Sequence, residues 1–253
     1  MEIGAQLYTV RALCKTEKDL GTTLDRIARL GYRYVQLSAL GPIDPPRVRA
    51  LCDDNGLLIV LTHDGENAFL NDIDALIDRQ RLYGCRYAGI GSMPERYRTP
   101  EGVERFAADF TPAAEKLRDA GMMFMYHNHA FEFARLPGGT LLMDRLLALM
   151  PPELMGVTAD TYWLQYGGMD VCAWLGAHMD RLRCVHLKDY TVSGFEARMA
   201  PVGRGNLDFE RILGLLKAGG VTEYALVEQD DCYGESAFDC LGESLKNLRA
   251  LGM

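Results

Sequence analysis

The chain has 253 residues, of which 48% are hydrophobic and 25% are charged, and its formal net charge at pH 7 is −8. This composition is ordinary for a globular protein, and the length suits one large domain. The negative charge argues against nucleic acid as a partner, and no apolar run approaches the ~20 residues of a membrane-spanning helix.

The first half of the chain alternates between predicted strands and predicted helices. Apolar runs predict strands at residues 2–8, 34–38, 57–62 and 87–90, and helical spacing predicts helices at residues 19–30, 45–55, 72–83 and 99–120. Gly31 follows the first helix as a C-terminal cap, and Thr99 and Pro100 begin the fourth as N-cap and first residue. Pro112 lies inside this fourth helix and predicts a kink or a break there.

The second half repeats the alternation. Strands are expected at residues 122–125, 155–159, 184–188 and 224–228, and helices at residues 140–150, 170–178, 208–218 and 236–251. A long loop is expected after residue 188, through Gly194 and residues 201–206. Eight strand–helix pairs predict a closed (β/α)8 TIM barrel as a single domain over residues 1–253. An open doubly wound sheet is the alternative, but the first strand lacks a Gly-x-Gly-x-x-Gly sequence after it.

Four strands of the second half lead into ionisable residues, namely Glu132, Asp160, His186 and Glu228. Singly, each acid has a common alternative as a helix N-cap or a solvated side chain. In a barrel, however, all four would meet at the mouth, where three carboxylates without a cation would repel one another. Oxygen-rich ligation with one nitrogen suits one divalent ion, with manganese the first choice and magnesium, cobalt or zinc as alternatives.

Other side chains near the predicted mouth are candidates for binding the substrate. Lys188 follows His186 by two residues and therefore projects to the same side of the strand. His127 and His129 either orient the substrate, support Glu132 or bond backbone carbonyls. His63 ends the third strand and also lies at the mouth.

Two further candidates lie in loops. Trp163 is expected either to form the floor of a sugar pocket or to pack at the base of a loop. Arg204, between two glycines after the seventh strand, lies where TIM barrels often bind anions, or it is a solvated surface arginine.

Several motifs resemble the sugar phosphate isomerase/epimerase family of xylose isomerase-like TIM barrels. The resemblance covers almost the whole chain and rests on Gln-Leu-Tyr-Thr-Val-Arg (6–11), His-Asn-His-x-Phe-Glu (127–132), Asp-Thr-x-Trp (160–163), His-Leu-Lys-Asp (186–189), Pro-Val-Gly-Arg-Gly-Asn-Leu-Asp-Phe (201–209) and Val-Glu-Gln-Asp (227–230). It implies one divalent metal held by Glu132, Asp160, His186 and Glu228, with the two glutamates as acid/base pair. Ala130 departs from the family, since many relatives carry aspartate there, which affects the detail of the pocket.

The resemblance implies a metal-dependent isomerase or epimerase that acts on a keto-sugar, keto-glycoside or polyol through an enediolate. A dehydratase or lyase of the inosose dehydratase or 3-keto-glycoside type on the same site is the alternative, and a non-catalytic sugar-binding barrel is a third reading. A nuclease barrel would need a richer metal cluster and a basic face. An unphosphorylated substrate is expected, because the loop of residues 229–234 is acidic.

The seven cysteines are an odd number without Cys-x-x-Cys spacing, and most lie in apolar segments. We therefore expect reduced thiols and a cytoplasmic protein, which also agrees with a first segment that lacks the basic start of a signal peptide. The sequence leaves open whether the chain forms a homo-oligomer.

Overall fold

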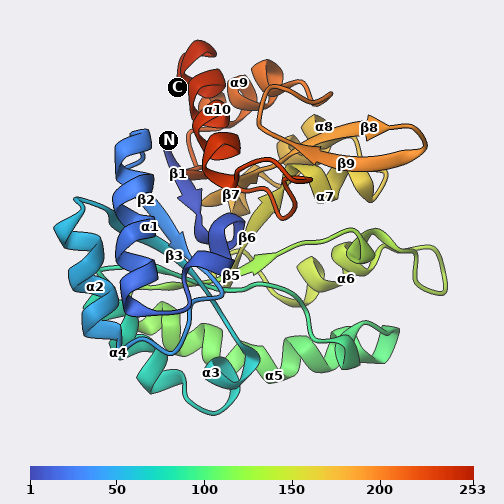
Figure 1. Cartoon of the computed structure of the whole chain (residues 1–253). Helices are drawn as coiled ribbons and strands as arrows, with labels where there is room; N and C mark the ends of the chain where they lie inside the picture. The colour runs from blue at the N-terminus through green and yellow to red at the C-terminus, as the bar shows by residue number, and fades with distance from the viewer.

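Eight parallel strands form a closed barrel in the computed structural model, which describes residues 1–253 (Figure 1). The strands are β1 (Glu2–Gln6), β2 (Tyr34–Leu37), β3 (Leu58–Asp64), β4 (Tyr87–Ile90), β5 (Met123–His127), β6 (Met155–Asp160), β7 (Cys184–Leu187) and β10 (Tyr224–Val227). Their order around the barrel follows the chain, and the pairing of β1 with β10 closes the ring. The predicted (β/α)8 barrel is confirmed.

The α-helices lie outside the ring of strands (Figure 1). They are α1 (Glu17–Leu30), α2 (Pro45–Asp54), α3 (Glu66–Leu70), α4 (Ile73–Tyr83), α5 (Pro100–Asp119), α6 (Leu142–Leu149), α7 (Thr161–Tyr166), α8 (Val171–Ala177), α9 (Phe209–Gly219) and α10 (Ala237–Ala250). The short helices α3 and α7 follow β3 and β6 directly and were not predicted. They lie at the barrel mouth, where the parallel strands end.

Local sequence explains where the helices begin and end. The side chain of Thr99 accepts a hydrogen bond from the backbone N–H of Gly102 at 2.9 Å, and Gly31 caps α1 with a φ of 102°. Both predicted caps are confirmed. Pro112 lies inside an unbroken α5, so a break there was wrong. The buried face of α5 holds the helix against the barrel, with the rings of Phe110 and Phe124 stacked at 5.6 Å.

The loop expected after β7 contains an antiparallel hairpin of β8 (Asp189–Ser193) and β9 (Glu196–Ala200), which projects from the barrel (Figure 1). The carboxylate of Asp189 closes its base by accepting backbone hydrogen bonds from Gly203, Gly205 and Leu207 at 2.9, 2.8 and 3.2 Å. A Cβ at position 205 would lie 2.5 Å from Asp189 Oδ1, so glycine is required there.

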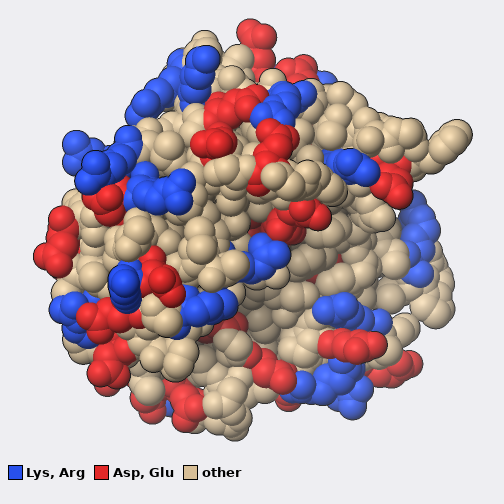
Figure 2. All heavy atoms as spheres, viewed as in Figure 1, with Lys and Arg blue, Asp and Glu red and all other residues tan.

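The main hydrophobic core, of 60 buried residues, lies mostly between the strands and the helices. All seven cysteines are free thiols. None of the helices combines the length and hydrophobicity needed to cross a membrane. Basic and acidic side chains are interspersed over the face in Figure 2, which shows no continuous basic surface.

Candidate metal centre

The inward faces of the barrel strands change from apolar to ionisable toward the mouth. Met125, Cys184 and Leu226 belong to a small buried cluster inside the barrel. Two residues further along the same strands come His127, His186 and Glu228, which face the same way because side chains alternate along a strand. Asp160 ends β6 beside them. One donor atom from each of the four residues lies within 4.8 Å of the other three, and all four side chains are buried.

Hydrogen bonds from outside this group orient both imidazoles. His186 Nε2 lies 2.7 Å from Gln36 Oε1, and His127 Nδ1 lies 2.9 Å from the carbonyl oxygen of Gly91. Because these oxygens only accept hydrogen bonds, each of the two nitrogens carries a hydrogen. The other nitrogen of each ring therefore turns toward the carboxylates. Such an outer partner is typical of metal-binding histidines.

The two carboxylate oxygens of Asp160 have different roles, one in capping a helix and one in the candidate metal site. Its Oδ1 accepts the backbone N–H of Trp163 at 3.0 Å and so caps α7, while its own N–H donates to Asn128 Oδ1 at 3.0 Å. Its Oδ2 lies 3.3 Å from His127 Nε2. The helix-cap role and the cluster role, treated as alternatives from the sequence, are thus filled by different oxygens of one side chain.

Lys188 supplies the positive charge nearest the carboxylates. Its ammonium nitrogen lies 3.0 Å from Asp160 Oδ2, 3.0 Å from Glu228 Oε2 and 3.1 Å from Asp230. Burial opposes ionisation of Glu228, but Lys188 and His186 outweigh it and hold its pKa well below the usual range. Burial likewise opposes the charge on His186, whereas Glu228 and Asp160 raise its pKa to about 9. In the absence of a metal ion, a proton on His186 therefore balances part of the negative charge.

Glu132 does not join the group of four. It lies in the 3-10 turn Phe131–Phe133, where its Oε1 accepts the hydroxyl of Tyr126 at 2.7 Å and its Oε2 accepts the backbone N–H of His129 at 2.9 Å. Burial raises its pKa to about 7. His127 takes the β5 position in the cluster instead. The sequence of β5 could have predicted this, because side chains alternate between the two faces of a strand. Met125 and His127 therefore share the inward face, whereas Glu132 lies beyond the end of the strand.

A cavity of about 280 Å³ opens above the cluster. Four of the residues predicted to bind substrate line it, namely His63, His127, His129 and Lys188. Glu228 and Asp230 add carboxylates to its wall. The side chains of His63 and His129 each contain a buried ring nitrogen that has no hydrogen-bond partner in the protein. A polar ligand in the cavity would satisfy these atoms.

The last two candidates do not line this cavity, and Trp163, which was expected in a loop, lies in α7. The ring of Trp163 lies 5.2 Å from that of His129 and 5.6 Å from the nitrogen of Lys188, so it supports two residues of the wall. Arg204 is bonded at the surface to Glu243 and to Glu235, the latter at 2.7 Å. The Arg204 side chain therefore ties the loop after β9 to α10.

Comparison with known proteins agrees with this fold. The sequence pattern of the xylose isomerase-like TIM barrel family matches residues 24–251, and the chain belongs to that family. An inosose dehydratase from Geobacillus kaustophilus is 28% identical over 216 residues, which cover 74% of this chain and 66% of that protein. The chain thus spans slightly less than two thirds of the length of this curated relative.

Two solved structures share the architecture. A sugar phosphate isomerase/epimerase from Parabacteroides distasonis superimposes with a TM-score of 0.82 at 23% identity, covering 98% of this chain and 94% of that one. The IOLI protein, crystallised with a bound zinc atom, superimposes with a TM-score of 0.72 at 13% identity, covering 99% of this chain and 98% of that one. At these identities the likeness establishes the fold alone.

Proposed function

We propose that the protein is a divalent-metal-dependent enzyme that removes a proton next to the carbonyl group of an unphosphorylated carbohydrate. The observation that carries this proposal is the group of His127, Asp160, His186 and Glu228, whose donor atoms converge within 4.8 Å at the base of a polar cavity. Both imidazoles have their outer nitrogens occupied, so the inner ones face Asp160 and Glu228 and would bind an ion in place of the proton on His186.

The donor set fits a borderline divalent ion. Two imidazole nitrogens and two carboxylate oxygens suit zinc, cobalt or manganese better than magnesium, which prefers oxygen. Because His127 takes the place predicted for Glu132, the set has two nitrogen donors instead of one. Zinc is therefore as good a candidate for the bound ion as manganese. An ion held by these residues would supply Lewis acidity toward a substrate carbonyl and stabilise the negative charge that develops on deprotonation.

The chain's own residues provide the proton transfers. Glu228 and Asp230 are the two carboxylates that line the cavity, and Lys188 contacts both. Glu228 is proposed as the base, because it lines the cavity and the ammonium group of Lys188 keeps it ionised. The ammonium group of Lys188 can donate to an oxygen of the substrate and hold it against the carboxylates.

The position of Glu132 bears on the outcome of the reaction. Epimerisation needs two proton carriers on opposite faces of one carbon, and the predicted partner of Glu228 does not line the cavity. Elimination needs one base and a donor to the leaving group: the α C–H and the β C–O bonds break, a C=C bond forms, and the hydroxyl leaves as water. We therefore place a dehydratase first, which agrees with the inosose dehydratase relative.

An epimerase or isomerase is the second candidate, because His63 and His129 offer unpartnered ring nitrogens at the cavity. Either could carry the second proton. An unphosphorylated substrate is favoured in both cases, since Arg204 is occupied by Glu243 and Glu235 and Asp230 faces the cavity.

Elemental analysis and solvent exchange test the proposal together. Purified protein is expected to hold about one divalent ion per chain, and the loaded protein should exchange substrate hydrogen with D₂O. Inososes, keto-glycosides, ketoses and ketose phosphates would be compared by NMR. Loss of water identifies the dehydratase, and exchange with inversion identifies the epimerase. Binding of a sugar without any exchange would leave only the non-catalytic reading.

A further inference from the structure

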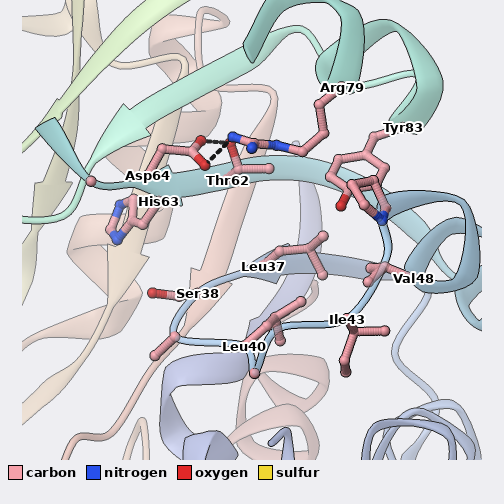
Figure 3. Close-up of a pocket in the computed structure, with 14 residues that line it drawn as sticks. Leu37, Ser38, Leu40, Ile43, Val48, Thr62, His63, Asp64, Arg79 and Tyr83 are labelled. Atoms are coloured by element: carbon pink, nitrogen blue, oxygen red, sulfur yellow. Dashed lines mark hydrogen bonds and ion pairs between the residues drawn. The ribbon is translucent and has the colours of Figure 1, made fainter. Parts of the chain in front are cut away.

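A second cavity, of about 370 Å³, lies beside the metal centre, between the segment that follows β2 and helices α2 and α4 (Figure 3). One part of its wall is apolar and consists of Leu37, Leu40, Ile43, Val48 and Tyr83, and the remainder is polar. The volume is sufficient for a group the size of a small aromatic ring system. No residue of the proposed catalytic group lines this cavity.

The second cavity adjoins the cavity at the candidate metal centre. Ser38 and His63 line both. The ring of His63 lies 5.5 Å from that of His186 and 5.2 Å from that of His127, and its buried Nε2 has no partner in the protein. Because the two cavities share Ser38 and His63, a single ligand that occupied both would pass beside His63.

The charged residues of the second cavity neutralise each other. Asp64 Oδ1 accepts a hydrogen bond from Arg79 at 2.5 Å, and Asp64 Oδ2 accepts one from the hydroxyl of Thr62 at 2.6 Å (Figure 3). Both carboxylate oxygens are thus occupied. The cavity offers apolar surface and a closed ion pair, which suits an uncharged group better than an anion or a cation.

The wall formed by the segment after β2 is held in place before any ligand binds. Ala39 adopts a left-handed backbone conformation with a φ of 54°, and its carbonyl accepts Lys15 Nζ at 2.5 Å. The N–H of Gly41 donates to the carbonyl of Cys14 at 2.9 Å, and a Cβ at Gly41 would lie 1.9 Å from the carbonyl oxygen of Lys15. A fixed, unusual backbone of this kind is typical of a preformed binding surface.

We propose that this second cavity binds the uncharged, apolar aglycone of a glycoside whose sugar ring lies at the metal centre. The substrate is then a keto-glycoside, with a carbonyl group on its sugar ring and an aryl or alkyl aglycone, rather than a free monosaccharide or cyclic polyol. The proposal rests on the proposed function for the position of the sugar ring. Beyond the proposed function, it names the group attached to the sugar ring.

Calorimetric titration of the metal-loaded protein tests this proposal with two unreactive probes, 2-naphthyl β-D-glucopyranoside and methyl β-D-glucopyranoside. The naphthyl glycoside is expected to bind at least about tenfold more tightly, because its ring system leaves water for the apolar side chains of the second cavity. Ile43→Asp and, separately, Leu40→Asp should bring the naphthyl glycoside down to the affinity of the methyl glycoside. Both side chains are partly exposed, so these variants should fold.

Leu82→Asp is the matched control, since Leu82 lies on α4, is 42% exposed and does not line the cavity. It should leave both affinities unchanged. Equal affinities of the two probes for the wild-type protein, or a preference that survives in Ile43→Asp and Leu40→Asp, would overturn the aglycone site. Because binding needs no turnover, failure of the D₂O exchange assay would count against the proposed function and leave this measurement intact.

Discussion

The two halves of the barrel differ in what their strands carry to the mouth. The strands β5, β6, β7 and β10 lead to imidazoles and carboxylates, whereas the first four strands lead mainly to uncharged residues such as Gln36 and Gly91, with His63 and Asp64 at the end of β3 as the exceptions. Yet these two residues orient His186 and His127 through hydrogen bonds. The first half thus positions the groups that the second half supplies, and it also forms the apolar cavity beside them.

Removal of a donor from the second half should have the largest effect. His186→Ala is expected to weaken metal binding by more than about 100-fold, beyond the range typical for outer hydrogen-bond partners, and to abolish turnover. Metal content after gel filtration and activity after addition of Zn²⁺ or Mn²⁺ would be measured. A variant that retains one tightly bound ion would show that the metal lies elsewhere.

Glu228→Gln should reduce turnover by roughly two to four orders of magnitude, because an amide cannot accept the proton. Metal occupancy must be determined in the same sample, since Glu228 is also a proposed ligand. Activity at the wild-type level with full occupancy would assign the base to another residue, with Asp230 the next candidate at the cavity.

Gln36→Leu tests whether the first half only positions the site. The loss of the acceptor for His186 Nε2 should lower metal affinity by roughly 10–100-fold and leave the ion bound at saturating concentration. Competition with a fluorescent chelator measures this effect. If Gln36→Leu lowered metal affinity as much as His186→Ala, the first half of the barrel would do more than position the ligands of the second half.

Glu132→Gln distinguishes the ligand set predicted from the sequence from the one that the fold assembles. We expect full metal occupancy and a loss of about 1–3 kcal/mol in the free energy of unfolding, because the amide nitrogen cannot accept from Tyr126 or from the His129 N–H. Urea denaturation and metal analysis check both. Loss of the ion would restore Glu132 as a ligand that moves on binding.

Arg204→Ala should have the smallest effect. Its ion pairs with Glu243 and Glu235 are exposed, so we expect a change below about 1 kcal/mol in stability. The ratio of activity toward free and phosphorylated sugars should not change. A selective loss of activity toward the phosphorylated sugars would mean that Arg204 leaves these partners to bind phosphate.

The sequence predicted the barrel because long-range order follows from eight repeated strand–helix units, each visible in the apolar runs. It also placed Asp160, His186 and Glu228 together, since all end or continue inward faces of strands. It placed Glu132 there instead of His127, because the predicted strand ended at residue 125 and the two-residue alternation was not followed on to His127. Nor did it reveal Gln36 as a partner of His186, which lies 150 residues away in the chain and meets it only when the barrel closes.

The carboxylate of Asp189, the first residue of the β8–β9 hairpin, also binds the backbone of the segment that follows the hairpin. Because Asp189 holds the backbone at Gly203, Gly205 and Leu207, the chain leaves the barrel and returns to it at a single fixed point. The length of the β8–β9 hairpin can therefore change without a change in the geometry of the barrel strands. Insertions or deletions at the tip, around the exposed Phe195, are therefore expected to leave β7 and the candidate metal centre undisturbed. Asp189 thus makes this segment a place where relatives of one fold can diverge.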